Sequence, residues 1–244
     1  MGSRECRYLA VIPARKGSKG LRNKNLRLIG MKPMIQYTIE AAQGSLRLDS
    51  TVLTTDDVSI LRLAKRLKVE YLLRRPNYLA TDMARTTDVV RHALLWIKSH
   101  VGIVPENIVL LQPTSPFRTR SDVDAVIDAF EGCKSSSIMS VCEVSQHPAE
   151  CVSLREDGSA RFLAVRGETT FRRQQYNAFY FVDGAIYICR TKTFLKTGTF
   201  FHRDTKVHIL PRSHCIDIDD IFGLSIARAM MAFAEHTYPH ILNL

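Results

Sequence analysis

The chain has 244 residues, of which 45% are hydrophobic and 24% are charged, with 12 glycines and nine prolines spread along it. These proportions are typical of a globular protein and exclude a disordered or fibrous chain. Lysine and arginine (34) exceed aspartate and glutamate (24) by ten. An excess of that size predicts that the partners of the protein are anions.

Strands and helices alternate over the first 140 residues. Short apolar runs that end at proline or aspartate predict strands, whereas apolar residues at helical spacing predict amphipathic helices. Ser121 is expected to cap the last of these helices. The alternation predicts a doubly wound, mostly parallel sheet. We expect strands at 8–12, 51–55, 69–72, 108–112 and 137–144, and helices at 34–42, 58–67, 87–100 and 122–130.

The rhythm changes after the fifth predicted strand. Short strand-like pieces at 151–154 and 160–165, joined by polar turns, replace the strand–helix alternation. A strand at 179–189 and a closing helix at 221–236 follow. We therefore divide the chain into an α/β domain, residues 1–142 and 183–244, and an inserted lid or dimerisation segment, residues 143–182.

The six cysteines are scattered, without a C-x-x-C pair and without histidines at metal-ligand spacing. This usage predicts reduced, mostly buried thiols and argues against a zinc site. The N-terminus does not read as a signal peptide, and no apolar run approaches the roughly 20 residues that span a bilayer. We expect a cytoplasmic protein with no membrane partner. The cysteines are Cys6, Cys133, Cys142, Cys151, Cys189 and Cys215.

A basic, glycine-containing loop, residues 12–20, follows the first predicted strand. In open α/β sheets ligands bind at that end of the strands, and glycines let backbone N–H groups approach phosphate oxygens closely. The spacing is neither that of a Walker loop nor that of a dinucleotide-binding turn. Its alternative interpretation is a solvated basic loop. Because the densest basic run, 15–27, contains no aromatic residue, it favours phosphate capture over nucleic-acid binding.

Five motifs, spread over residues 8 to 224, resemble the CMP-sialic acid synthetase (acylneuraminate cytidylyltransferase) family, which includes CMP-legionaminic acid synthetases. They occur in the order in which the family has them. Two positions depart from its pattern: Lys16 replaces a glycine, and Asp183 replaces an asparagine. The motifs are I-P-A-R-x-G-S-K-G-x-x-x-K-N at 12–25, Q-P-T-S-P-F-R at 112–118, R-Q at 173–174, G-A-I-Y at 184–187 and I-D-I-D at 216–219.

The resemblance implies a Rossmann-like fold of the nucleotide-diphospho-sugar transferase type and a defined reaction. The anomeric hydroxyl of a nine-carbon 2-keto sugar acid attacks the α-phosphorus of CTP, and pyrophosphate leaves. Such transfers depend on positioning and on neutralising charge. We expect Arg15, Lys19 and Asp217 to be catalytic, and the general base is left open. The expected CTP-binding residues are Ala14, Arg15, Gly17, Ser18, Lys19, Asn25, Arg75, Thr86 and Thr87, of which Arg75 rests on the resemblance.

Asp217 and Asp219 are the candidate metal ligands. Carboxylates at i and i+2 of an extended segment point to the same side, and Mg²⁺ favours one or two carboxylates together with substrate phosphates. Mn²⁺ is a possible substitute. The alternative is an acidic helix start, because Asp219 and Asp220 precede Ile221. The resemblance favours the metal.

The acceptor has a carboxylate beside its anomeric carbon, and a planar cation binds such a group with two hydrogen bonds. Arg173 is the expected cation, with Arg172 as its alternative. Gln112 and Gln174 would contact sugar hydroxyls or the N-acyl group, and Tyr187 completes the sugar site. The resemblance also implies a homodimer in which the insertion reaches across, so that Arg173 would serve either its own or the other subunit's site.

Two other functions compete with this interpretation. One is a cytidylyltransferase for the eight-carbon acid 3-deoxy-manno-octulosonate, whose family shares the fold but lacks a motif of the 112–118 type. The other belongs to a different class, a nucleic-acid-binding module that would explain the charge of +10. Binding of that kind weakens steeply with salt. We expect no nucleic-acid partner.

Overall fold

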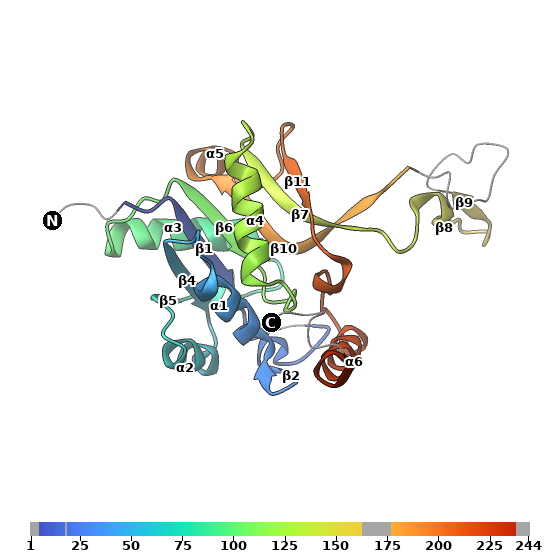
Figure 1. Ribbon diagram of the computed structural model, residues 1–244, viewed down its shortest axis with the longest axis horizontal. Coiled ribbons are helices and arrows are strands. Elements are labelled where there is room, and N and C mark those ends of the chain that lie inside the picture. The colour runs from blue at the N-terminus through green and yellow to red at the C-terminus, as the bar shows by residue number, and fades with distance from the viewer. Residues whose placement is uncertain (1–4, 18, 163–176, 238–244) are drawn as a thin grey trace.

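The computed structural model describes residues 5–17, 19–162 and 177–237. Within them a central sheet has the strand order β5-β4-β1-β6-β10-β7-β11, and β10 alone runs antiparallel to its neighbours (Figure 1). The doubly wound, mostly parallel sheet is thereby confirmed. Its strands are β1 (Tyr8–Pro13), β4 (Ser50–Thr55), β5 (Tyr71–Arg74), β6 (Asn107–Leu111), β7 (Ser137–Glu143), β10 (Tyr180–Arg190) and β11 (Lys206–Ile209).

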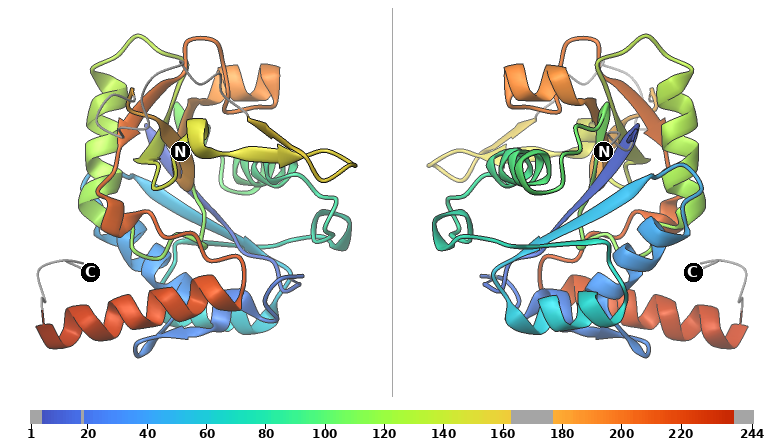
Figure 2. Two further views of the ribbon diagram at one scale, coloured as in Figure 1. Left: turned by 90° about the vertical axis from the view of Figure 1, so that its right-hand side faces the viewer. Right: turned by 90° about the vertical axis from the view of Figure 1, so that its left-hand side faces the viewer.

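Helices cover both faces of the sheet, and Figure 2 shows α3 and α4 on opposite sides of it. Tyr8, Ala10 and Ile12 pack with α1 (Met34–Gly44), α2 (Val58–Arg66) and α4 (Arg120–Glu131). Leu9 and Val11 pack instead with α3 (Thr86–His100) and α5 (Thr191–Thr197). Alternate residues of a strand face opposite ways, so one apolar strand supplies both halves of the core.

A third apolar cluster lies below the sheet, where α6 (Ile221–Thr237) packs on the small hairpin of β2 (Leu28–Ile29) and β3 (Lys32–Pro33). Figure 1 shows α6 beside this hairpin. In the part of the chain that the structure describes, four 3₁₀ turns connect elements: η1 (Lys24–Leu26), η2 (Asn77–Leu79), η3 (Pro148–Glu150) and η5 (Arg212–His214). Among the described helices, none has the length and apolar character of a membrane span.

The inserted segment projects from the sheet as an arm (Figure 1). It carries a hairpin of β8 (Val152–Leu154) and β9 (Ala160–Phe162), and β7 and the first residues of β10 lead into and out of it. The pairing of β7 with β10 shifts register between Val182 and Tyr187. The predicted strand 160–165 is described as far as Phe162. The boundaries 143 and 182 remain a prediction.

Most predicted elements have the expected type, but one cap was assigned to the wrong residue. Thr119, not Ser121, caps α4: its hydroxyl accepts the N–H of Asp122 at 3.1 Å, and the Asp122 carboxylate accepts the N–H of Thr119 at 2.8 Å. This reciprocal pair is a capping box, and it satisfies two N–H groups that a helix start leaves free. The helix therefore begins at Arg120, two residues before the expected start.

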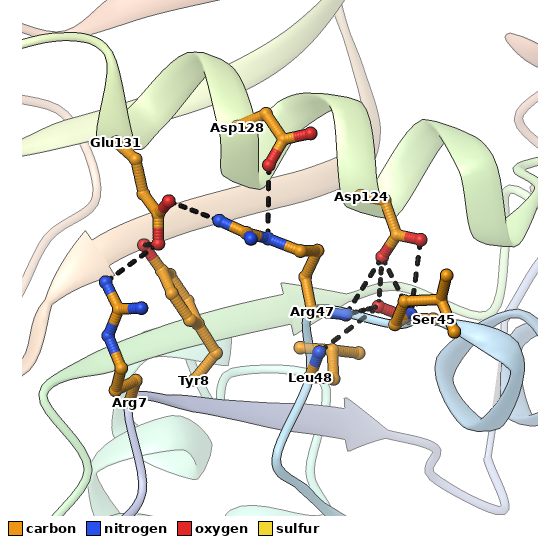
Figure 3. A network of polar contacts seen from close by, with 9 residues as sticks. Arg7, Tyr8, Ser45, Arg47, Leu48, Asp124, Asp128 and Glu131 are labelled. Carbon is orange, nitrogen blue, oxygen red and sulfur yellow. Dashed lines mark hydrogen bonds and ion pairs between the residues drawn. The ribbon is translucent and has the colours of Figure 1, made fainter.

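A network of charged residues fixes the end of the sheet at which β1 begins (Figure 3). Glu131 on α4 binds Arg7 at 2.8 Å and also pairs with Arg47, and Asp124 accepts the backbone N–H groups of Leu46 and Arg47. Burial, together with Glu131, raises the pKa of Tyr8 to about 12. Because these contacts lie at the amino ends of the strands, they stabilise the fold and leave the carboxyl ends for the site.

Candidate active site

A cleft of about 320 Å³ opens at the carboxyl ends of β1, β5 and β6. Open α/β sheets bind ligands at this edge, and small-molecule pockets begin at about this volume. Its walls combine cations, carboxylates and hydroxyls. The lining residues are Pro13, Arg15, Gly17, Lys24, Asn25, Arg75, Leu79, Thr81, Asp82, Ala84, Thr86, Val89, Gln112, Pro113, Thr114, Asp217 and Asp219.

The basic loop that follows β1 is anchored through its backbone. Ala14 is buried and donates its N–H to the Thr54 carbonyl at 3.0 Å, and the N–H of Lys16 binds Asp56 Oδ1 at 2.8 Å. Further along, the buried Asn25 donates its side-chain N–H to the Arg15 carbonyl at 3.0 Å. Asn25 therefore closes the loop on itself and fixes where the Arg15 side chain leaves the backbone.

Three ion pairs link the loop and the turn after it to opposite walls of the cleft. On one side, Arg15 Nη1 lies 2.5 Å from Asp82 Oδ1, and Lys19 Nζ lies 3.4 Å from the other oxygen of the same carboxylate. On the other side, Lys24 Nζ lies 2.9 Å from Asp219 Oδ1. Hydrogen bonds from Arg15 hold the pKa of Asp82 below its usual range. Arg15, Lys19 and Lys24 thus each face a carboxylate.

Arg75, at the end of β5, lies buried in the cleft wall. Its Nη2 donates to the Thr54 carbonyl at 2.9 Å, whereas its buried Nε has no partner among the described residues. Burial lowers the pKa of Arg75 to about 10, and at neutral pH the guanidinium is charged. Thr86, the first residue of α3, lines the same cleft, and its neighbour Thr87 does not.

Gln112 lies in the turn after β6, and the buried Arg118 holds this turn in place through hydrogen bonds. Arg118 donates to the Ala185 carbonyl at 2.7 Å, the Gln112 carbonyl at 3.2 Å and the Thr38 hydroxyl at 2.6 Å. Gly184 has φ +77°, and a Cβ there would lie 3.0 Å from Gln112 Oε1. Glycine is therefore required at residue 184 for its backbone angle, and the close approach places Gln112 against β10.

Asp217 and Asp219 lie in the segment before α6, which the backbone bond from Ile218 N–H to the Thr114 carbonyl (2.9 Å) ties to the 112–118 turn. The Asp217 side chain is exposed on the cleft wall, but the protein around it partly desolvates the carboxyl. This desolvation, together with the charge of Asp219, raises the pKa of Asp217 above its ordinary value. The helix cap is a different residue, because Asp220 Oδ1 accepts the N–H of Gly223 at 2.7 Å.

The structure brings most of the predicted site residues to this one cleft: Arg15, Gly17, Asn25, Arg75, Thr86, Gln112, Asp217 and Asp219. Lys19 stands at its rim, paired with Asp82, and Ala14 continues the strand. Tyr187 does not line the cleft. Its ring lies 5.8 Å from that of Phe200, and burial raises its pKa to about 12. Ser18, Arg172, Arg173 and Gln174 lie outside the described residues.

Residues that the sequence reasoning did not single out complete the cleft, above all Lys24, Asp82 and Thr114. Asp56 acts from outside it by holding the Lys16 N–H. Lys24 and Thr114 belong to motifs that the sequence analysis quoted, so their places in those motifs were the available signal. Asp82 and Asp56 carry no such signal, because only the fold brings β4, β5 and the loop together.

Comparison with known proteins gives a consistent result. The family model described as "Cytidylyltransferase" matches residues 9–210. N-acylneuraminate cytidylyltransferase of Escherichia coli O18:K1:H7 is 32% identical over 91% of this chain and 51% of its own. CMP-N,N'-diacetyllegionaminic acid synthase of Legionella pneumophila is 33% identical over 92% of this chain and 96% of its own. The chain thus spans about half the length of the N-acylneuraminate enzymes and nearly all of the legionaminic acid enzyme.

Among solved structures, the CMP:2-keto-3-deoxy-manno-octonic acid synthetase complexed with CTP superposes with a TM-score of 0.66. It is 18% identical, and the match covers 93% of this chain and 98% of that one. At that identity the likeness shows the shared fold alone. The family model covers most of the chain, and the chain matches the legionaminic acid relative over almost the full length of that relative. These two matches show that this chain belongs to the cytidylyltransferase family.

Proposed function

We propose that this chain transfers cytidylate from CTP to a nine-carbon 2-keto-3-deoxy sugar acid, an N-acylneuraminate or legionaminic acid, and releases pyrophosphate. The observation that carries the proposal is that four charged residues share one cleft. Arg15 and Arg75 lie on the side formed by the loop after β1 and by β5, and Asp217 and Asp219 lie opposite them. Cations are suited to a triphosphate, and paired carboxylates to the metal that accompanies it. The names of the relatives support the same substrates.

The nucleotide would lie along the loop after β1. Arg15 and Lys19, with the backbone N–H groups around Gly17 and Ser18, would hold the β- and γ-phosphates of the leaving group, and Ala14 and Asn25 would fix the loop beneath them. Arg75 and Thr86 would contact the cytidine, whereas Thr87, which does not line the cleft, is assigned no contact. The buried Nε of Arg75 supports this assignment, because it is a donor without a partner among the described residues. Buried donors normally have a partner.

The sugar acid would lie toward Gln112, whose amide reads hydroxyls or the N-acyl group. Gly184 holds β10 close against this side chain, so the acceptor pocket is bounded by the turn after β6. We assign the carboxylate of the acceptor to Arg173, with Gln174 as a further contact. Tyr187, whose ring packs beside Phe200 and does not line the cleft, is assigned no contact. Arg173 and Gln174 lie outside the described residues, and this part of the site rests on the family resemblance.

The residues present suit Mg²⁺, with Mn²⁺ as a possible substitute. Lys24 Nζ lies 2.9 Å from Asp219 Oδ1, so this carboxylate accepts a cation. Desolvation, and after it the charge of Asp219, raises the pKa of Asp217, and a divalent ion would relieve the repulsion between the two carboxylates. The described residues gather no group of three or more metal-binding side chains, so substrate phosphates would supply the remaining ligands. When bound, the ion would neutralise charge on the α-phosphate.

We further propose a homodimer formed through the arm. Val152 and Leu154 of β8 are 45% and 76% exposed, and Phe181 and Val182 of β10 are 41% and 44% exposed. Exposed apolar surface on a projecting hairpin is typical of an interface. Replacing Leu154 with Asp should yield a monomer in sedimentation, whereas Leu46→Asp, also at an exposed leucine but remote from the arm, should not. A monomeric wild type would contradict the dimer.

The cytoplasm is the proposed compartment. Cys133, Cys142, Cys151, Cys189 and Cys215 form no disulfide, and Cys142, Cys189 and Cys215 are buried. Disulfides are rare where thiols are kept reduced, and five cysteines without a disulfide are suited to that environment.

Pyrophosphate release tests the proposal directly. Purified protein is supplied with CTP, Mg²⁺ and one sugar acid at a time: N-acetylneuraminate, diacetyllegionaminate or 3-deoxy-manno-octulosonate. Turnover with one of the first two is expected. Turnover with the eight-carbon acid alone would favour the competing cytidylyltransferase. Absence of turnover together with nanomolar binding of a random oligonucleotide at physiological salt would favour a nucleic-acid-binding protein.

A further inference from the structure

Asp82 lies on the segment between β5 and α3, and its carboxylate bridges two cations of the loop after β1. Its Oδ1 lies 2.5 Å from Arg15 Nη1, and its Oδ2 lies 3.4 Å from Lys19 Nζ. The carboxylate and the Arg15 side chain both line the cleft. Each oxygen of Asp82 is thus directed to one of the two cations that the proposed function assigns to the triphosphate.

A carboxylate and a phosphate present the same feature to an arginine or lysine, a pair of anionic oxygens. Asp82 therefore occupies a donor of Arg15 and faces Lys19 where phosphate oxygens would bind. Hydrogen bonds from Arg15 and Lys19 hold the pKa of Asp82 below its usual range, so the carboxylate is ionised at neutral pH. If Asp82 stayed in place beside a bound triphosphate, like charges would repel each other across a short distance.

All three side chains are open to solvent, so a phosphate ligand can replace Asp82 on the two cations easily. Arg15 is 32% exposed, Asp82 38% and Lys19 81%. Ion pairs open to solvent contribute little to stability and break readily, whereas a triphosphate or pyrophosphate offers several charges to the same cations at once. A multiply charged ligand would therefore displace Asp82, and the carboxylate would return when the ligand leaves.

We infer that Asp82 is an internal counterion that occupies Arg15 and Lys19 in the free protein and competes with the phosphates of substrate and product for them. This inference rests on the proposed function. Its consequence is a weakened affinity for polyphosphate, which favours release of pyrophosphate after the reaction.

The test is the affinity for inorganic pyrophosphate, measured by isothermal titration calorimetry in wild type and in Asp82→Asn. Removal of the competing charge should lower the Kd roughly two- to five-fold, which is the range of an exposed ion pair. Asp88→Asn is the matched control, because it removes the same charge from the start of α3, where Asp88 pairs with Arg85 at 3.1 Å instead of with the loop. Its Kd should equal that of wild type.

A second comparison locates the effect. In an Arg15→Ala background, Asp82→Asn should strengthen pyrophosphate binding less than it does in wild type, because one of the two cations that Asp82 occupies is gone. Thermal melts of each variant establish that it is folded, and Asp82→Ser replaces Asp82→Asn if the latter is not.

The possible results separate this inference from the proposed function. An unchanged or higher Kd in the Asp82 variant, or an equal fall in Asp88→Asn, would overturn the counterion role and leave the proposed function standing. A wild-type protein that binds neither pyrophosphate nor CTP would overturn both.

Discussion

Gly20 packs directly against the backbone of Asp219: a Cβ at residue 20 would lie 2.4 Å from the Asp219 carbonyl oxygen. The loop after β1 and the segment that carries the candidate metal ligands therefore contact each other through their backbones. The ion pair between Lys24 and Asp219, at 2.9 Å, joins the same two segments through their side chains. The two halves of the proposed site cannot move independently.

This contact predicts that Gly20→Ala impairs activity far more than stability. The contact is to backbone, so no side chain can rotate to relieve it, and either the loop or the Asp219 segment must shift. Misplacement of reacting groups by about 1 Å costs on the order of 100-fold in rate. We expect at least a ten-fold fall in kcat/KM together with a raised Mg²⁺ requirement.

Gly132→Ala is the matched control for this substitution, since the nearest atom to a Cβ at residue 132 is 3.5 Å away, an ordinary contact at the end of α4. Steady-state kinetics at several Mg²⁺ concentrations distinguish the two variants. A Gly20→Ala enzyme with wild-type kinetics would show that the two segments are not coupled in the working protein.

The fold class follows from features that act locally. The apolar run at 8–12 becomes β1, and the helical spacing at 58–67 becomes α2, because each pattern has only one way to bury its apolar side chains. The direction of β10 does not follow, since the antiparallel pairing with β6 depends on the path of the intervening chain. Likewise, Thr119 and Ser121 each stand three residues before an aspartate, and only the fold determines that Thr119 and Asp122 form the capping box.

Arg15→Ala is expected to weaken CTP binding. Its guanidinium lines the cleft, and loss of one charge-assisted hydrogen bond costs about 1.5–3 kcal/mol, or roughly 10- to 150-fold in affinity. The KM for the sugar acid should change little. Arg22→Ala removes an exposed cation of the same loop that does not line the cleft and should retain wild-type CTP affinity. Titration calorimetry with CTP measures the affinity of each variant. Equal losses of CTP affinity in both variants would refute a specific role for Arg15.

Acid stability should depend on the pair formed by His214 and Asp122, whose Nδ1 and Oδ2 atoms lie 2.8 Å apart. Burial alone would raise the pKa of Asp122, but hydrogen bonds from His214 and Thr119 outweigh it and hold the pKa below its ordinary value. A carboxyl with a depressed folded-state pKa contributes stability above its unfolded pKa, about 3.9. That contribution is lost as the pH falls through the lower, folded-state value.

The variant His214→Ala should therefore lose about 1–3 kcal/mol at pH 6 and unfold at a higher pH than wild type when acidified. His100→Ala, at an exposed histidine whose hydrogen bonds are local to the end of α3, is the control. Denaturant melts between pH 3 and 7 measure both. If the free energies of unfolding of His214→Ala and wild type differed by the same amount at every pH in this range, the pair would not govern acid stability.

The candidate site was predictable where its residues lie in contiguous motifs. Arg15 and Gln112 lie just after β1 and β6, and parallel strands bring their carboxyl ends to one edge. Asn25 belongs to the same motif as Arg15. Asp82 was not predictable in this way. It lies in a segment between β5 and α3, and its contact with Arg15, 67 positions away in sequence, exists only in the folded chain.

We expect neighbouring aspartates in the segment before α6 to play two separate roles. Asp220 caps the helix through the Gly223 N–H at 2.7 Å, whereas Asp217 and Asp219 line the cleft. If the latter two hold Mg²⁺, then Asp217→Asn and Asp219→Asn keep the shape of the side chains but remove anionic ligands. Activity should fall by orders of magnitude with little change in Tm, and Mn²⁺, which accepts varied ligands, should restore part of it. Asp220→Ala should do the reverse and lower stability by about 1 kcal/mol, the usual cost of a lost cap, without changing the Mg²⁺ requirement.

The measurements are turnover against Mg²⁺ concentration, a thermal melt of each variant, and Mn²⁺ binding in the presence of CTP. Wild-type turnover and Mn²⁺ binding in both Asn variants would mean that these two carboxylates hold no metal.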